Sequence, residues 1–388
     1  MYIKRSVTPL IQSTLDRGKI AIVYGARQVG KTTLAKEISK SYKKPLYLNC
    51  DDPSVVSSLT EKSAIELKSY IGDSDLVVID EAQRVENIGI SIKLIHDTYP
   101  EYSLLITGSS SLDLANKVTE PLTGRSIETI LYPLSVREVS AKSSDIPLMS
   151  KTLLDRGGYP GMWHLSAKEA HEQLTNIANN YIFKDALSPA VIYDQTTVTD
   201  LLRLLAFQVG HEVNYTELAT KLSISKDTVQ RYIDLLEKAF IVFRRNQYRR
   251  NLRSEVGRLR KVYFYDLGIR NALIDNFKPA DLRDDMGQLW ENYCIVERLK
   301  YLQFGRRSVR SFYWRNPDGR EIDIVEEESD QIRAYECKLS PSKSASKPAA
   351  FGQQYPTASY TTINPNTLSR DFLSPSNTSG NQQDSQPC

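Results

Sequence analysis

Short apolar runs and amphipathic stretches alternate along the first third of the chain. Apolar runs occupy residues 19–24, 45–49, 76–79 and 103–107, and a helical pattern begins at Lys31 after the first of them. Strands that alternate with helices in this way are typical of a parallel sheet covered on both faces. We therefore predict an α/β domain at the start of the chain.

The pattern then changes character twice. Apolar residues at helical spacing within residues 167–181 and 196–209 predict a mainly helical region, and from residue 262 the chain returns to mixed strands and helices. Beyond residue 366 the sequence is rich in Ser, Asn, Gln and Pro. It has few apolar side chains to offset the entropy of ordering, so we predict a disordered tail.

The composition is that of a globular protein. Of 388 residues, 40% are hydrophobic and 25% are charged, and this length suggests roughly two to three domains. No apolar run approaches the ~20 residues of a membrane-spanning helix, so we expect no membrane partner. The N-terminus has no signal-peptide pattern and the four cysteines form no CxxC pair, which favours a reducing, cytoplasmic location.

A phosphate-binding loop is the most specific motif. Residues 25–32 match G-x-x-x-x-G-K-[ST] between a predicted strand and a predicted helix. Its glycines let backbone N–H groups face phosphates at the positive end of the helix, while Lys31 would reach the β- and γ-phosphates and the Thr32 hydroxyl would ligate Mg²⁺. We expect ATP and Mg²⁺ as cofactors. The predicted nucleotide-contacting residues are Gly25, Ala26, Arg27, Gln28, Val29, Gly30, Lys31, Thr32 and Thr33.

Two acidic residues follow the predicted strand at residues 76–79. Asp80 would lie beside the loop and help to hold Mg²⁺, and Glu81 would polarise the attacking water. Alone, such a pair is more often a helix cap. After a phosphate-binding loop it favours hydrolysis.

Two further catalytic candidates are less specific. Thr107 ends the next predicted strand and would hydrogen-bond the water or the γ-phosphate, unless it is an ordinary turn threonine. Arg125 would stabilise transition-state charge in its own site or in a neighbour's, and a surface salt bridge is the alternative. An arginine that acts on a neighbour would imply a homo-oligomer.

A basic segment follows the helical region. Residues 215–222 and 226–238 predict two helices joined by a tight turn, and residues 240–243 predict a wing strand that leads into an arginine run. We expect a winged helix-turn-helix that contacts DNA. The alternatives are protein docking and a solvated arginine face. The predicted nucleic-acid contacts are Lys226, Thr228, Arg231, Arg249 and Arg250.

The C-terminal part contains a weak D…E-x-K pattern. Asp323 lies in one predicted strand, and Glu336 and Lys338 share a face of the next. Two carboxylates would hold Mg²⁺ and the lysine would steady a phosphodiester, with Glu291 as an additional acid from the preceding helix. This resembles the PD-(D/E)xK nuclease pattern. The alternative is a Lys–Glu pair across neighbouring strands. Whether the domain cleaves DNA is left open, because some proteins use this fold for binding alone.

The ordered set of motifs resembles a known family. Besides residues 22–33, it includes residues 80–83, 107–111, 124–135 and 157–160, and continues to nearly residue 365. This series is similar to the prokaryotic AAA-type ATPases that carry a DUF4143 domain. The resemblance implies an AAA-like ATPase core, a winged-helix segment and a nuclease-like C-terminal domain.

From the residues and the resemblance together we expect five segments and a coupled function. The segments are an AAA-like P-loop core (1–140), a helical region (141–210), a winged helix-turn-helix (211–265), a DUF4143 PD-(D/E)xK nuclease-like domain (266–365) and a disordered tail (366–388). We expect an ATPase coupled to a DNA-binding module, with DNA cleavage left open. The alternatives are a nucleotide-dependent switch or scaffold with an inactive nuclease-like domain, and a nuclease whose P-loop is only an assembly switch.

Overall fold

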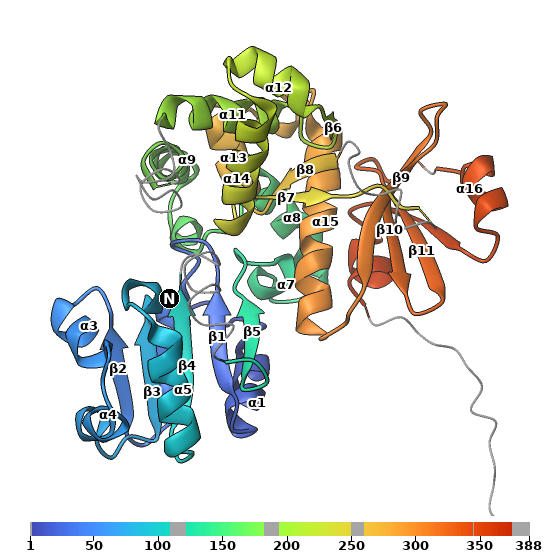
Figure 1. Ribbon diagram of the computed structural model, residues 1–388. Helices are drawn as coiled ribbons and strands as arrows, with labels where there is room; N and C mark the ends of the chain where they lie inside the picture. Colours follow the sequence, from blue (N-terminus) through green and yellow to red (C-terminus); the bar gives the residue numbers. More distant parts are fainter. Residues whose placement is uncertain (1, 109–121, 182–193, 250–259, 344, 375–388) are drawn as a thin grey trace, which may run out of the picture.

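A computed structural model describes residues 2–108, 122–181, 194–249, 260–343 and 345–374 (Figure 1). The N-terminal part is a parallel five-stranded sheet of order β2-β3-β4-β1-β5. Its strands are β1 (Ile20–Tyr24), β2 (Pro45–Asn49), β3 (Leu76–Asp80), β4 (Ser103–Gly108) and β5 (Ser126–Ile130). Every residue of β1 and β3 is buried, as the continuous apolar runs predict. The predicted P-loop α/β core is confirmed.

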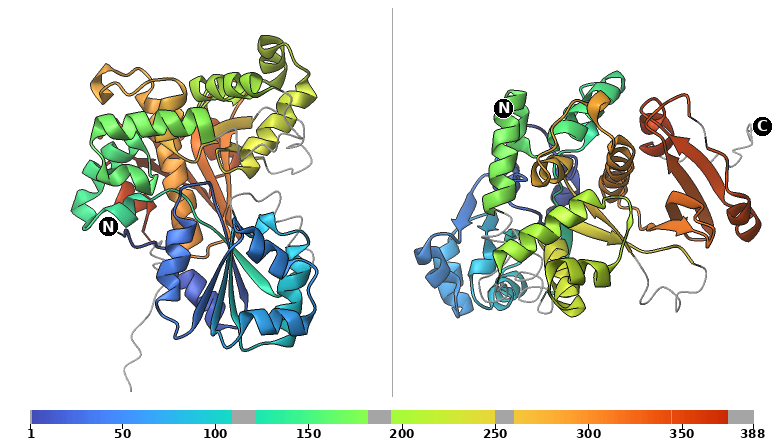
Figure 2. Two further views of the ribbon diagram at one scale, coloured as in Figure 1. Left: turned by 90° about the vertical axis from the view of Figure 1, so that its left-hand side faces the viewer. Right: turned by 90° about the horizontal axis from the view of Figure 1, so that it is seen from above.

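Helices cover both faces of this sheet (Figure 2). They are α1 (Thr8–Asp16), α2 (Lys31–Ser39), α3 (Pro53–Leu59), α4 (Ala64–Ile71) and α5 (Ile88–Thr98), with the short turn η1 (Ala82–Arg84) after β3. Because all five strands run in the same direction, the loops that follow them meet at one edge of the sheet.

A helical middle part follows, as its apolar spacing predicts. It contains α7 (Val136–Val139), η3 (Ser143–Asp145), α8 (Ile146–Arg156), η4 (Pro160–His164), α9 (Ala167–Asn176), η5 (Ile177–Tyr181) and α11 (Gln195–Phe207), with α14 (Leu267–Leu273) and η7 (Ala280–Leu282) contributed from later in the chain. Two interactions of α14 show how this part closes: Asp266 accepts a hydrogen bond of 2.7 Å from the Gly158 amide, and Asn271 donates to the Leu154 carbonyl.

Two short helices and a small sheet form the next part. They are α12 (Tyr215–Leu222) and α13 (Lys226–Lys238), with β6 (Glu212–Val213), β7 (Val242–Arg245) and β8 (Arg260–Phe264) in the order β6-β8-β7. The helix bounds coincide with those predicted from the sequence. Asn214 caps α12, Ser223 turns the chain with a left-handed φ of 55°, and Ser225 caps α13.

The C-terminal part combines one long helix with a mixed four-stranded sheet. The helix is α15 (Met286–Phe304), and the sheet has the order β12-β11-β10-β9, with α16 (Ala349–Gln354) beside it. The strands are β9 (Arg310–Arg315), β10 (Glu321–Glu328), β11 (Gln331–Cys337) and β12 (Ser359–Ile363). Only β11 and β12 pair in parallel among these described strands.

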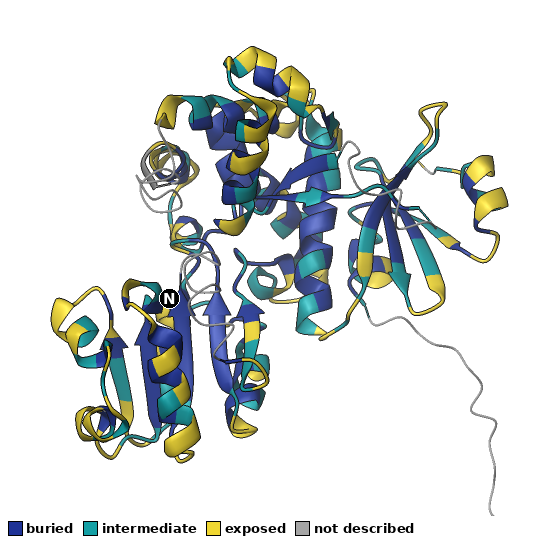
Figure 3. Cartoon of the chain, in the orientation of Figure 1, coloured by how far each residue is buried: buried dark blue, intermediate teal, exposed yellow. Residues whose placement is uncertain are grey.

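Helix α15 lies between the two larger sheets (Figure 1, Figure 3). Residues 292–298 are buried without a break, which is nearly two helical turns, so the helix is enclosed on every side there. Near its C-terminal end, Gln303 donates to the carbonyl of Ile130 at the end of β5, and Lys300 donates to the carbonyl of Leu134. One helix therefore connects the edge of the parallel sheet with the C-terminal sheet.

The first residues of the predicted disordered tail are folded. Residues 366–374 are folded and include η8 (Leu368–Phe372), because Leu368, Phe372 and Leu373 are buried in the main core. Burying these three apolar side chains offsets the entropy lost when residues 366–374 become ordered. The polar composition of the surrounding sequence predicts that this entropy would keep the segment disordered. Residues 375–388 lie outside the described part of the chain. Within the described part, no helix combines the length and the apolar character needed to cross a bilayer.

Candidate functional site

The phosphate-binding loop connects the carboxyl end of β1 to α2. At Gly25 a Cβ atom would lie 2.4 Å from the carbonyl oxygen of Leu131, so no side chain fits there. Gly30 has a left-handed φ of 96° and immediately precedes α2. The first N–H groups of a helix have no partner within the helix, and here they lie at the end of the loop. The loop backbone is therefore arranged to accept an anion.

Lys31 is folded into this loop. Its side chain is buried, and Nζ donates to the carbonyls of Gly25 at 2.9 Å and Ala26 at 3.0 Å. Burial lowers the pKa of Lys31 to about 8, although the carboxylates of Glu81 and Asp80 oppose that shift. A bound anion would stabilise the charged form of this buried ammonium.

Asp80 joins the loop to the central strands. The Thr32 hydroxyl donates to its Oδ2 at 2.7 Å, the Tyr47 hydroxyl donates to the same oxygen, and the Thr107 hydroxyl donates to Oδ1. Hydroxyl and carboxylate oxygens are the donors that Mg²⁺ prefers, so the pair Thr32 and Asp80 fits this ion. Thr107 is 1% exposed and holds Asp80. A contact of Thr107 with the water or the γ-phosphate stays a prediction.

A cleft of about 380 Å³ opens over these groups. It is lined by Arg27, Gln28, Gly30, Lys31, Thr32, Thr33, Asp51, Glu81 and Arg84. Glu81 has a left-handed φ of 54°, and its carboxylate accepts a hydrogen bond of 2.5 Å from Gln83. The cleft thus brings Glu81 together with the predicted nucleotide-contacting loop.

Sequence reasoning missed three residues of this region. Tyr47 contacts Asp80 from β2, and Asp51 and Arg84 line the cleft. Only their positions near the ends of predicted strands could have indicated them, because the carboxyl ends of parallel strands meet at one edge.

The prediction that Arg125 acts in its own nucleotide site is wrong. Arg125 precedes β5, and its carbonyl accepts a hydrogen bond from Ile20 at the start of β1, whereas the phosphate loop follows the opposite end of β1. Its guanidinium pairs with Asp97, at 2.7 Å and 2.9 Å. Parallel pairing places Arg125 at the wrong edge of the sheet, and it forms the surface salt bridge that was the alternative interpretation.

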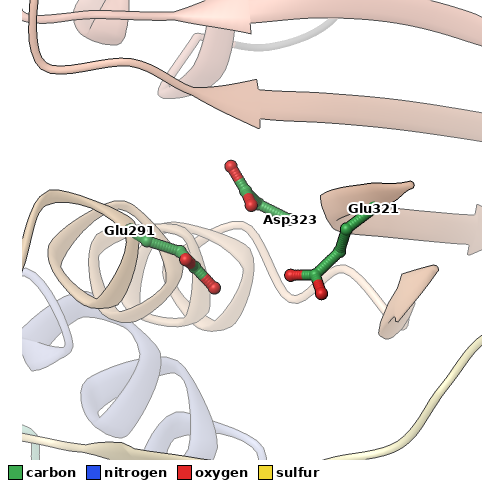
Figure 4. A group of neighbouring side chains, drawn as sticks. All are labelled: Glu291, Glu321 and Asp323. Carbon is green, nitrogen blue, oxygen red and sulfur yellow. The ribbon is translucent and has the colours of Figure 1, made fainter. Parts of the chain in front are cut away.

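A second group of acidic residues lies where α15 meets the C-terminal sheet. Carboxylate oxygens of Glu291, Glu321 and Asp323 all lie within 4.8 Å of one another (Figure 4). Lys261, from β8, is 1% exposed, lies 3.0 Å from Oε1 of Glu291 and also pairs with Glu321. A cleft of about 730 Å³ adjoins this carboxylate cluster, and Lys338 lines it.

The structure adds one acid to the predicted metal site. Asp323 meets Glu291 and Glu321, and Glu336 pairs with Lys338 at 2.6 Å. That Asp323 and Glu336 hold one metal ion stays a prediction. Glu321 lies two residues before Asp323 on β10, and alternate residues of a strand share a face. The same rule that was applied to Glu336 and Lys338 could therefore have indicated Glu321, which sequence reasoning missed.

Asp323 is the most deeply buried of the three acids. Its Oδ2 accepts a hydrogen bond of 2.7 Å from the amide of Cys337. Burial raises the pKa of Asp323 well above its usual range, and the carboxylates of Glu291 and Glu336 raise it further. The ammonium of Lys261 opposes this shift of the Asp323 pKa, so the charges of the lysine and the acids influence one another.

The predicted DNA-contacting residues differ in their exposure and in their partners within the protein. Lys226 and Arg231 are exposed on α13, whereas Thr228 is half-buried and bonded to Ser225. The guanidinium of Arg249 donates to Gln247, and Arg250 lies outside the described residues.

Within the described residues, three further cations of the basic run have partners inside the protein. Arg244 pairs with Asp234 and Glu237. Arg245 is buried and donates to the carbonyl of Phe312 at 2.7 Å, and Lys261 is enclosed by the carboxylate cluster. A run of basic residues in the sequence does not show which of their side chains bind partners within the folded protein.

Comparison with known proteins places these features in a family. Residues 17–140 match an AAA domain, residues 149–280 match a domain of unknown function, DUF8612, and residues 286–369 match DUF4143. An uncharacterized protein of Mycobacterium tuberculosis is 26% identical over 348 residues, which are 89% of this chain and 76% of that protein. An uncharacterized protein of Methanocaldococcus jannaschii is 24% identical over 376 residues, covering 85% of this chain and 77% of that protein.

Among solved structures, a Walker-type ATPase of Pyrococcus abyssi is similar with a TM-score of 0.49 and 15% identity, covering 70% of this chain and 96% of the other. The domain matches and the parallel sheet with its phosphate loop agree with one another. The chain belongs to the AAA-type ATPases that carry a C-terminal DUF4143 domain.

Proposed function

We propose that the protein binds Mg-ATP in the cleft beside the phosphate loop and hydrolyses it. The observation that carries this proposal is the contact between Thr32 and Asp80, 2.7 Å apart, with the buried Lys31 beside them. Together they supply one ammonium and the oxygen donors for one Mg²⁺, at the end of a helix that favours anions.

Each residue has a distinct task in this reaction. Lys31 exchanges the carbonyls of Gly25 and Ala26 for the β- and γ-phosphates, and Thr32 and Asp80 hold Mg²⁺, which would neutralise phosphate charge. Glu81 orients a water and accepts its proton. The water oxygen bonds to the γ-phosphorus as the bond to the β–γ bridging oxygen breaks, releasing ADP and phosphate.

Two substitutions test this proposal. Lys31→Ala removes the only ammonium aimed into the loop among the described residues, so both ATP and ADP affinity should fall, and Glu81→Gln should abolish turnover while ATP binding persists. Lys40→Ala, at the exposed end of the same helix, is the matched control. Calorimetry and a phosphate-release assay measure the two effects. Unchanged turnover in both active-cleft variants would refute the proposal.

We also propose that residues 211–265 form a winged helix-turn-helix that binds DNA. Support comes from the order β6-β8-β7 around α12 and α13 and from the exposed Lys226 and Arg231 on α13. Fluorescence anisotropy with duplex DNA should show affinity that falls steeply with salt, and less steeply in Lys226→Ala/Arg231→Ala. Salt-independent retention, or none, would favour the protein-docking alternative.

The carboxylate cluster supports a second candidate, a metal-dependent nuclease centre. The specific observation is that Glu291, Glu321 and Asp323 adjoin a cleft that Lys338 also lines. However, Lys261 already pairs with two of these acids and offsets part of their charge, which favours a domain that binds without cleaving. Plasmid nicking with Mg²⁺ or Mn²⁺ that is lost in Asp323→Ala and Lys338→Ala would support cleavage. Intact plasmid under every metal and nucleotide condition would refute it.

A further inference from the structure

Two arginines line the nucleotide cleft, and one of them is held in an exchangeable ion pair. Arg84 is the last residue of η1, three positions after Glu81. Its Nε lies 2.5 Å from Oδ1 of Asp51, which also lines the cleft. Arg27, the other arginine, belongs to the phosphate loop itself.

The fold explains why Arg84 and Asp51 meet. Strands β2 and β3 are parallel neighbours with Asn49 opposite Asp80, and the Cys50 amide donates to the Asp80 carbonyl at 3.0 Å. The residues that follow the two strands therefore emerge side by side at the cleft. The left-handed turn at Glu81 leads into η1, whose last residue, Arg84, lines the cleft.

Arg84 can readily leave Asp51 for another anion. The Arg84 side chain is 49% exposed and that of Asp51 is 53% exposed. Exposed pairs of this kind contribute little to stability, because water screens the attraction and ordering two long side chains costs entropy. A phosphoryl group carries more charge than a carboxylate and accepts two parallel hydrogen bonds from a guanidinium.

We propose that Arg84 leaves Asp51 to bind the terminal phosphate of ATP and is the arginine that stabilises the transferring phosphoryl group. This assignment rests on the proposed ATP hydrolysis. In its own chain Arg125 cannot take this role, because it lies at the opposite edge of the sheet and pairs with Asp97. With ADP there is no terminal phosphoryl group to compete, so Arg84 stays on Asp51.

The test compares ATP with ADP in the full chain. Arg84→Ala should lower kcat by about 10²–10³-fold and weaken ATP binding by about tenfold, while ADP affinity in calorimetry with Mg²⁺ stays within about twofold. Asp51→Asn removes the competing carboxylate, so ATP affinity should rise and ADP affinity should not change. Arg84→Lys keeps the charge without the planar donor pair, and kcat should fall by about tenfold or more.

The outcomes separate this assignment from the broader proposal. If the unaltered protein shows no ATP turnover, the proposed function fails. If it turns over ATP and Arg84→Ala matches it, or if Arg84→Ala weakens ADP as much as ATP, the Arg84 assignment is overturned. Should Arg84→Ala melt early and fail to fold, the other two variants decide: normal turnover in Arg84→Lys together with unchanged ATP affinity in Asp51→Asn overturns the assignment.

Discussion

The hydroxyl of Thr32 donates a hydrogen bond of 2.7 Å to Oδ2 of Asp80. This contact joins the first turn of α2 to the end of β3, two elements far apart in the sequence. It brings the two groups proposed to hold Mg²⁺ into position before any nucleotide arrives.

Replacing Asp80 by Asn should separate magnesium binding from nucleotide binding. Thr32 and Thr107 donate to different oxygens of Asp80, so the amide keeps an oxygen for one of them and presents its NH2 group to the other, and it loses the negative charge that attracts the cation. We expect the Mg²⁺-dependent part of ATP affinity to fall by about tenfold or more, while affinity in EDTA changes little. Magnesium titrations monitored by calorimetry measure this. Asp75→Asn, at the amino end of β3, is the control, and an equal loss in EDTA would contradict the assignment.

The pH dependence of ATP binding should follow Lys31. Its pKa is lowered to about 8 by burial, so the ammonium that phosphates need is present below pH 8 and is lost above it. ATP affinity should be constant below pH 8, should fall as pH rises through this value, and binding at about pH 8.5 should take up protons. Calorimetry in buffers of different ionisation enthalpy detects the uptake. Lys31→Arg should remove this pH dependence, and a persistent transition there would assign it to another group.

The same shift affects folding stability with a defined sign. Because the folded-state pKa of Lys31 lies below its ordinary value of 10.5, burial of the ammonium costs stability below pH 8. That cost is relieved as pH rises from 8 to 10.5. The difference in unfolding free energy between the unaltered protein and Lys31→Met should therefore shrink over this range, as measured by urea unfolding. A constant difference would contradict the burial of a charged group.

Breaking the ion pair between Arg298 and Glu326 should strongly destabilise the C-terminal part. Their side chains are 4% and 0% exposed, so Arg298→Met leaves a buried carboxylate without its counter-charge. We expect a loss of about 3–5 kcal/mol in the free energy of unfolding. Arg310→Met, which removes a half-exposed partner of Glu327, should cost less than about 1 kcal/mol. Equal effects of the two substitutions in urea unfolding would refute the distinction.

Removing Lys261 should make the carboxylate cluster responsive to divalent cations. Lys261→Met leaves Glu291, Glu321 and Asp323 within 4.8 Å of one another without the ammonium. We expect this variant to melt earlier than the unaltered protein, and added Mn²⁺ to raise its melting temperature more than that of the unaltered protein. Lys343→Met, on the same cleft but outside the cluster, is the control. An Mn²⁺ response that Glu321→Gln does not reduce would contradict the assignment.

The sequence by itself determined the features that are local. The phosphate loop is one continuous segment of strand, glycine turn and helix, so its residues meet whatever the rest of the chain does. The bounds of α12 and α13 likewise follow from apolar spacing and from the caps at Asn214 and Ser225. Asp80 could be placed beside the loop because buried parallel strands bring their carboxyl ends to one edge.

Only the tertiary structure decided which charged groups meet. Sequence reasoning selected Arg125 for a phosphate and missed Arg84, but strand direction places Arg125 at the far edge of the sheet and Arg84 at the cleft. Helix α15 brings Glu291 to Glu321 and Asp323 of β10, and Lys261 pairs with Glu291 and Glu321 from a different sheet. Contacts between residues distant in the chain depend on strand order, register and packing, which a pattern along one strand does not encode.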